Sequence, residues 1–145
     1  MMRRSFGSSK FKVHGSKLGE KNMAIEQFED IDGWRLARIL THTVYHYTNQ
    51  GEFYRDFGLR DQIRKAAGSA MHNVAEGFDS ETNAEFIRFL RYAKRSCSEV
   101  QSELYVALDQ KYITSEEFHE TYDKARQTRA AIRGFINYLV EFEEK

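Results

Sequence analysis

The chain has 145 residues, contains no proline, and is 14% aromatic and 30% charged. This length suits one domain with a substantial core, and the absence of proline favours long uninterrupted helices over a turn-rich β-fold. A single cysteine, Cys97, excludes an internal disulfide framework and favours a reducing, cytoplasmic location. No apolar run approaches the roughly 20 residues that span a bilayer, so no membrane association is expected.

The formal net charge of zero conceals two parts of opposite charge. Residues 1–22 carry six basic residues and one acidic residue, a net charge of +5, whereas residues 23–145 carry 16 basic and 21 acidic residues, a net charge of −5. The first part has glycine and serine and no sustained apolar period, so we predict a disordered basic leader over residues 1–27. The predicted helical domain then covers residues 28–145.

Apolar residues spaced by three and four predict a first helix over residues 34–48 and a second over residues 58–77. In the loop between them, Phe53, Tyr54 and Phe57 are expected to close the end of the bundle. These two helices supply half of the expected core.

Two glycines of the second predicted helix, Gly68 and Gly77, are expected to have structural roles. Glycine in a helix interior costs about 1 kcal/mol relative to alanine, so Gly68 is expected to permit the close approach of a neighbouring helix. Gly77 is expected to end the helix in a left-handed conformation. Glu76 would then lie in the last turn, where the helix dipole disfavours a carboxylate, so a partner is expected for it.

The second half of the chain contains two regular heptad patterns, each preceded by the capping-box pattern Thr-x-x-Glu at Thr82 and Thr114. The predicted seam of the third helix is Phe86, Leu90, Ala93, Cys97, Val100, Leu104 and Ala107. The predicted seam of the fourth is Phe118, Thr121, Ala125, Thr128, Ile132, Phe135, Leu139 and Phe142. Short connections place successive helices antiparallel, which predicts an all-α, up-down-up-down four-helix bundle.

Several short motifs in this order resemble one known family. They are Gly58-Leu59, Gln62-Ile63-Arg64, Ala66-Ala67, Ser69 and Asn73-Val74-Ala75-Glu76-Gly77, followed by Glu85-Phe86, Phe89-Leu90, Ala93, Ser96 and Glu99. From Phe28 onward the chain resembles the four-helix-bundle family of 23S rRNA intervening-sequence proteins, and it is distantly similar to the accessory protein of diversity-generating retroelements. The resemblance implies ring-like homopentamers and a link to RNA or reverse-transcriptase biology.

Four polar residues, Asn73, Glu76, Ser96 and Glu99, occupy positions shared with the resembled family. Paired carboxylates are able to perform acid-base chemistry, but a buried polar network that fixes helix register is the favoured interpretation. No catalytic residue and no cofactor is assigned.

Basic residues form three sets at helical spacing, and together they are candidates for contacts with nucleic-acid phosphates. The sets are Arg60, Arg64 and Lys65; Arg88, Arg91 and Arg95; and Arg126, Arg129 and Arg133. The alternative is a solvated face with pairs within each helix, such as Glu85 with Arg88, because the net charge of residues 23–145 is negative.

Apolar residues outside the two seams exceed what a single bundle core requires. They are Ile87, Phe89, Tyr92, Tyr105, Val106 and Leu108 on the third helix and Ile136, Tyr138 and Val140 on the fourth. Exposed apolar surface usually marks an interface, so we predict a homo-oligomer, with a pentamer favoured by the resemblance.

The predicted function is a non-enzymatic, self-associating scaffold or adaptor that binds RNA or a nucleic-acid enzyme through its basic faces. The alternative is a metal-dependent or hydrolytic bundle enzyme that uses His42, His46 and Glu76. His42 and His46 lie four residues apart and can share a helix face, but two ligands do not make a metal site, so no metal is expected.

Overall fold

The computed structural model describes residues 12–14 and 22–144, and it consists mainly of helices. Four are long: α1 (Asp32–Thr48), α3 (Phe57–Asp79), α4 (Asn83–Asp109) and α5 (Ser115–Glu144). A short helix, α2 (Gly51–Arg55), and a 3₁₀ turn, η1 (Phe28–Asp30), complete the helical part. The predicted all-α class is confirmed. The part of the chain that is described contains no helix long and apolar enough to cross a membrane.

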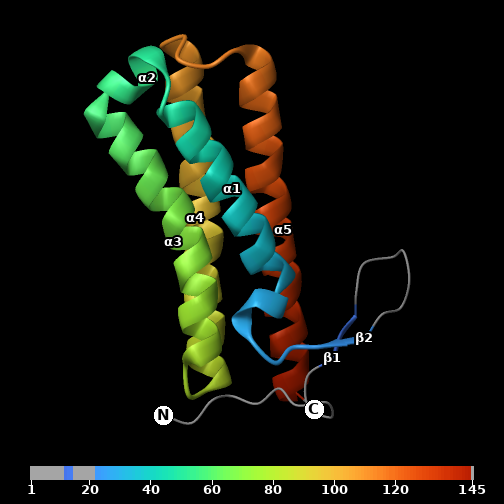
Figure 1. The fold of residues 1–145 in the computed structure, drawn as a ribbon. Helices are drawn as coiled ribbons and strands as arrows, with labels where there is room; N and C mark the ends of the chain where they lie inside the picture. The colour runs from blue at the N-terminus through green and yellow to red at the C-terminus, as the bar shows by residue number, and fades with distance from the viewer. Residues whose placement is uncertain (1–11, 15–21, 145) are drawn as a thin grey trace.

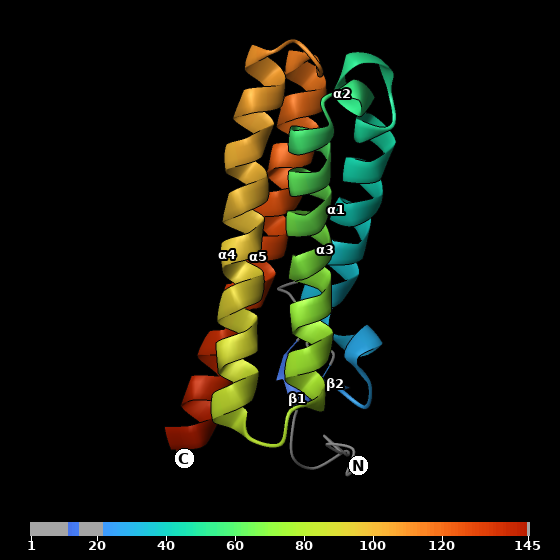
Figure 2. The same cartoon turned by 90° about the vertical axis from the view of Figure 1, so that its left-hand side faces the viewer.

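The four long helices lie side by side, with short segments connecting their ends (Figures 1 and 2). Helix α1 contacts α3 and α5, and α4 also contacts α3 and α5. The α1–α3 side of the molecule is therefore opposite the α4–α5 side.

The predicted leader, residues 1–27, lies mostly outside the described residues, which omit 1–11 and 15–21. In the part that is described, strand β1 (Lys12–His14) pairs antiparallel with β2 (Asn22–Ala24). Ile25 follows β2 and is 1% exposed in the bundle core, so core packing begins before η1.

The predicted seams form the core. All seven seam residues of α4 are buried, as are all those of α5 except Phe142, which is exposed. Phe86 packs against Phe78 and Phe135, with ring centroids 6.3 and 5.4 Å away. This aromatic cluster lies at the end of the bundle where α3 passes into α4.

At the opposite end of the bundle, the prediction that three aromatic residues of a loop close the end is only partly right. Residues 51–55 form helix α2, and only Phe53 is buried there, stacked on Tyr112 with ring centroids 5.4 Å apart. Tyr54 and Phe57 are exposed, and the guanidinium of Arg60 lies over both rings, at 4.8 and 4.7 Å from their centroids.

Side-chain caps fix the starts of α4 and α5. The Thr82 hydroxyl accepts a hydrogen bond from the Glu85 amide at 3.1 Å. Thr114 and Glu117 form the complete reciprocal box, in which the Thr114 amide donates to the Glu117 carboxylate at 2.8 Å and the Glu117 amide donates to the Thr114 hydroxyl at 3.1 Å.

The two glycines of α3 have roles other than those predicted. Gly77 does not end α3, which continues to Asp79, and its φ is not positive. A Cβ on Gly77 would lie 2.8 Å from Phe86 Cδ1 and 3.0 Å from Phe89 Cβ, so this glycine permits α4 to pack closely. A Cβ on Gly68 would meet only the His72 ring, at 3.7 Å, so no neighbouring helix requires that glycine.

Candidate nucleic-acid interface

The outer side of α4 carries Arg88, Arg91 and Arg95 because its seam faces inward, and all three are exposed. Tyr92 lies between them: the guanidinium carbons of Arg88 and Arg95 are 5.8 and 5.6 Å from its ring centroid. Arg88 also lies over Phe89 at 5.2 Å. The tyrosine and arginines thus form an aromatic, cationic patch, and both residue types stack on unpaired bases.

Helix α5 contributes Arg126, Arg129 and Arg133, which are all exposed. Arg126 pairs with Asp123, whereas no ion pair engages Arg129 or Arg133 among the described residues. Arg129 is close enough to α4 to influence the Cys97 thiol. Burial raises the pKa of that thiol to about 12, and the charge of Arg129 acts in the opposite direction.

Each of the two helices contains one long stretch without an acidic residue. Residues 86–98 of α4 contain four basic residues and no acidic residue, and residues 124–140 of α5 contain another four and none. Helices α4 and α5 are in contact, so these stretches lie on neighbouring helices, and we treat their basic residues as one set. We call it the α4–α5 basic face: Arg88, Arg91, Lys94 and Arg95 of α4 with Lys124, Arg126, Arg129 and Arg133 of α5.

Most of the cations on this face are free of ion pairs. Arg88 pairs with Glu85 at 3.5 Å and Lys124 with Glu120 at 3.6 Å, at the margins of the face. In the described part of the chain, five other members have no ion-pair partner: Arg91, Lys94, Arg95, Arg129 and Arg133. The face therefore keeps a positive potential that a solvated surface of balanced pairs would lose.

The third basic set, on α3, does not join this face. Arg60 lies against α2, and Arg64 donates a hydrogen bond to the Thr48 hydroxyl of α1 at 2.8 Å and lies 4.6 Å from the centroid of Tyr45. Lys65 is exposed. The arginines of α3 are thus directed toward α1 and α2, away from the α4–α5 basic face.

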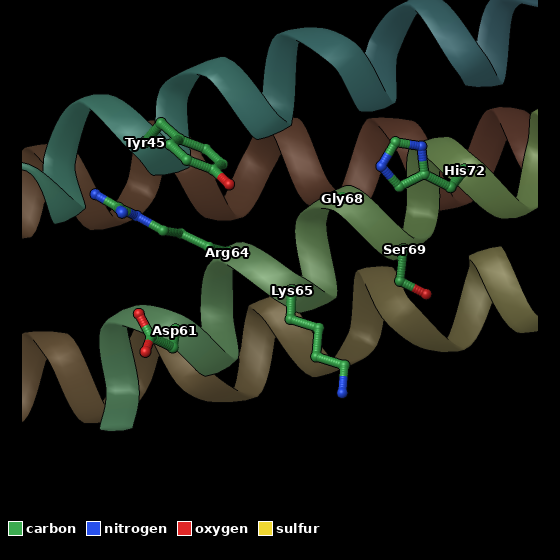
Figure 3. Close-up of a pocket in the computed structure, with 7 residues that line it drawn as sticks. All are labelled: Tyr45, Asp61, Arg64, Lys65, Gly68, Ser69 and His72. Atoms are coloured by element: carbon green, nitrogen blue, oxygen red, sulfur yellow. The ribbon is translucent and has the colours of Figure 1, made fainter. Parts of the chain in front are cut away.

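A concavity of about 500 Å³ lies over α3 and is lined by Tyr45, Asp61, Arg64, Lys65, Gly68, Ser69 and His72. Figure 3 shows Gly68 at its centre, with Arg64 and His72 on the side near Tyr45 and with Lys65 and Ser69 on the other side of the helix. All lining residues except Tyr45 belong to α3. The sequence pattern did not reveal this feature.

The four residues of the expected polar network occupy two kinds of environment. Asn73 donates to the backbone and hydroxyl oxygens of Ser69, both at 2.9 Å, and the Ser96 hydroxyl lies 2.9 Å from that of Ser69. Ser69, which the prediction did not include, therefore joins Asn73 on α3 to Ser96 on α4. Glu76 and Glu99 are exposed, and Glu76 has no hydrogen-bond or ion-pair partner in the described part of the chain.

A different carboxylate is buried. Glu103 lies two turns beyond Ser96 on the same face of α4, is 9% exposed, and has one carboxylate oxygen, Oε2, without a hydrogen-bond partner among the described residues. Burial, and secondly the charge of Glu99, raise its pKa to about 7. Its spacing of seven from Ser96 was available in the sequence, but nothing there marked it as unpaired.

The residues of the alternative enzyme are not brought together. His42 and His46 are exposed on α1, and the His46 ring nitrogen Nε2 lies 3.1 Å from the Gln50 amide nitrogen. Glu76 is exposed on a different helix, α3. Over the residues described, no group of three or more histidine, cysteine, aspartate or glutamate side chains is arranged to hold a metal.

Comparison with known proteins gives one family match. A family model described as 23S rRNA-intervening sequence protein matches residues 29–134, which include the whole of α1 to α4 and most of α5. Its description names no reaction. A comparison with curated proteins found no match.

Proposed function

Because the chain belongs to the 23S rRNA-intervening sequence protein family, we propose that it is a non-enzymatic, cytoplasmic scaffold that binds RNA. The single observation that carries this proposal is the α4–α5 basic face, where two neighbouring helices present eight basic residues over stretches without an acidic one. A net charge of −5 over residues 23–145 makes this concentration of positive charge local rather than general.

The expected binding mode is independent of base sequence. Exposed arginines and lysines would neutralise phosphates and release counterions, so affinity would fall steeply as salt rises. Tyr92, held between Arg88 and Arg95, offers a stacking surface for an unpaired base. We therefore expect single-stranded or looped RNA to bind more tightly than a continuous duplex of the same length.

Self-association forms the second part of the proposal. We take the four long helices as an antiparallel, up-down-up-down bundle whose exposed apolar residues meet another copy. Tyr105 and Val106 on α4 are 51% and 45% exposed, whereas Ile136, one of the surplus apolar residues, is buried in the core at 6%. A homopentamer, as the family resemblance implies, would repeat the basic face around an axis and raise avidity for RNA.

Titration of labelled RNA at low and physiological salt tests the proposal, with light scattering on the same samples to give the assembly mass. Replacing Arg88, Arg91 and Arg95 together by alanine should weaken binding at low salt about tenfold or more and reduce the salt dependence by about three counterions. Each variant retains the basic segment 1–22, so its contribution cancels in the comparison. A second series starting at Met23 measures binding without that segment.

The matched control removes three positive charges elsewhere, through Arg38→Ala, Arg55→Ala and Lys111→Gly. Glycine is chosen at position 111 because Lys111 has φ 62°, a conformation that glycine adopts without strain. Equal loss of affinity in the two triple variants would show that net charge, and not the basic face, determines binding. Absence of RNA binding by protein starting at Met23 at low salt would reject the RNA proposal and leave a protein partner as the function of the scaffold.

A further inference from the structure

Gly68 has no role in the packing of the chain on itself. It lies in the interior of α3, where glycine is less favourable than alanine. A Cβ at this position would make only an ordinary contact with the side chain of His72, whose Nε2 and Cδ2 atoms would be 3.7 and 3.8 Å away. The space above the glycine is open, and an imidazole nitrogen faces it.

Gly134, an exposed glycine in the interior of α5, provides a comparison for Gly68. A Cβ on Gly134 of α5 would have no atom within 4 Å. At Gly68, in contrast, the missing side chain lies within a hollow of about 500 Å³ with Tyr45 on its α1 side. The hollow exists because the side chains before and after Gly68 on the same face are long and the glycine is not (Figure 3).

The charges around this hollow favour an anion. Arg64 is held in place by the Thr48 hydroxyl and the Tyr45 ring. Lys65 and His72 are exposed and have no hydrogen-bond or ion-pair partner within the described residues. The one acidic lining residue, Asp61, accepts a hydrogen bond from Arg60 Nε at 2.9 Å, which offsets its charge.

We propose that the concavity over Gly68 binds the phosphate group of a small phosphomonoester. His72 Nε2 faces the position that the phosphate would occupy, and the unpaired side chain of Lys65, which points away from Gly68 in Figure 3, would turn toward the phosphate on binding. Arg64 contributes a fixed positive charge, as arginine does in many phosphate sites. Free phosphate, a nucleoside monophosphate and the 5′ end of an RNA present the same chemical group.

This proposal does not depend on the α4–α5 basic face, because the concavity lies on the opposite side of the bundle, over α3 and beside α1. Loss of RNA binding in the Arg88, Arg91 and Arg95 variant would leave it unaffected. Conversely, a chain that bound no phosphate at Gly68 could still bind RNA through the α4–α5 basic face.

Equilibrium dialysis of the full chain against radiolabelled inorganic phosphate provides the test. Wild type and the matched control Gly134→Leu should bind phosphate equally, and Gly68→Leu should weaken binding about tenfold or more by filling the hollow. Lys65→Ala should weaken it by a similar factor, since a charge-assisted hydrogen bond is lost, while Lys111→Gly should not. Gly68→Ala should raise the melting temperature and still reduce binding.

Competition separates the sources of the phosphate. A nucleoside monophosphate that displaces the label far better than its neutral nucleoside indicates a nucleotide site, and an RNA that competes only when 5′-phosphorylated indicates an RNA end. Equal phosphate binding by wild type and Gly68→Leu would overturn the proposal. A change in assembly mass in Gly68→Leu, without saturable phosphate binding by wild type, would also overturn it by identifying the hollow as a contact between copies.

Discussion

Helix α3 makes two different kinds of contact along its two flanks. Toward α4 the contact is close: Gly77 leaves no room for a side chain beside Phe86, and the hydroxyl groups of Ser69 and Ser96 are 2.9 Å apart. Toward α1, apolar side chains of the two helices pack beneath the surface, and at the surface Arg64 bonds to Thr48 beside an open polar concavity. One helix thus provides a rigid seam on one flank and an accessible surface on the other.

The comparison shows why two glycines nine positions apart in α3 have different structural roles. Gly77 is required by a neighbour that is present, whereas Gly68 leaves a space that no described residue fills. Adding a side chain should therefore destabilise the fold at Gly77, on the α4 flank, and be tolerated at Gly68, on the α1 flank.

The largest expected effect is that of Gly77→Leu. Its first added atom would already lie 2.8 Å from the ring of Phe86, which is buried and packed on Phe135, so the ring has little freedom to move. We expect the free energy of unfolding, measured in urea, to fall by about 3 kcal/mol or more. Gly68→Leu, in the open concavity on the α1 flank, should change it by less than about 0.5 kcal/mol. Equal effects at the two sites would break the comparison.

Glu103 differs from the other acidic residues of α4 because its carboxylate is buried, next to the seam residue Leu104. The pKa of Glu103 is raised from 4.5 to about 7, so the folded state binds a proton more tightly than the unfolded state. The stability that this protonation supplies is complete below pH 4.5 and is lost as the pH rises through about 7.

The variant Glu103→Gln should therefore be more stable than wild type at pH 8, by about 2 kcal/mol, and the difference should shrink toward pH 5. Thermal or urea unfolding across this pH range measures it. Glu99→Gln serves as the partial control, because it removes only the second cause of the shift. A Glu103→Gln difference that does not vary with pH would mean that this carboxylate is hydrated in the folded protein.

The smallest expected effect concerns the hydroxyl contact between α3 and α4. Replacing Ser96 by alanine should cost about 1 kcal/mol of unfolding free energy, since the Ser69 hydroxyl loses a partner in a half-buried position. In a double-mutant cycle with Ser69→Ala, the coupling energy should be about 0.5–1 kcal/mol. Independent, additive effects would show that the two hydroxyls are satisfied separately, Ser96 by the Tyr92 carbonyl at 3.1 Å.

The core of this fold could be predicted from sequence because its cause is local. Phe86 to Ala107 repeat at spacings of four and three, and any helix with that spacing must bury the resulting stripe. The caps at Thr82 and Thr114 are equally local, since each depends on a residue three positions away. These features fixed helix starts and core faces without knowledge of the neighbouring helices.

The features that were missed depend on which helices are neighbours. A glycine indicates backbone freedom or close approach, but only the position of Phe86 beside Gly77 distinguishes these roles. Helix-dipole reasoning selected Glu76, which is exposed, and gave no reason to choose Glu103, whose burial depends on packing between helices. The acid-free stretches of α4 and α5 are visible in the sequence, yet only the structure shows that they lie on neighbouring helices.

The burial of Cys97 makes the opening of the bundle measurable in real time. It is the only thiol in the chain, lies in the middle of the α4 seam with 0% exposure, and has its pKa raised to about 12. The thiolate attacks a disulfide reagent and displaces one of its sulfur atoms as a thiolate, so at neutral pH the buried Cys97 reacts only after the helices separate. The labelling rate of the unmodified protein therefore counts openings of this seam, and a change in that rate when RNA or phosphate is added reports how far each ligand holds the helices together.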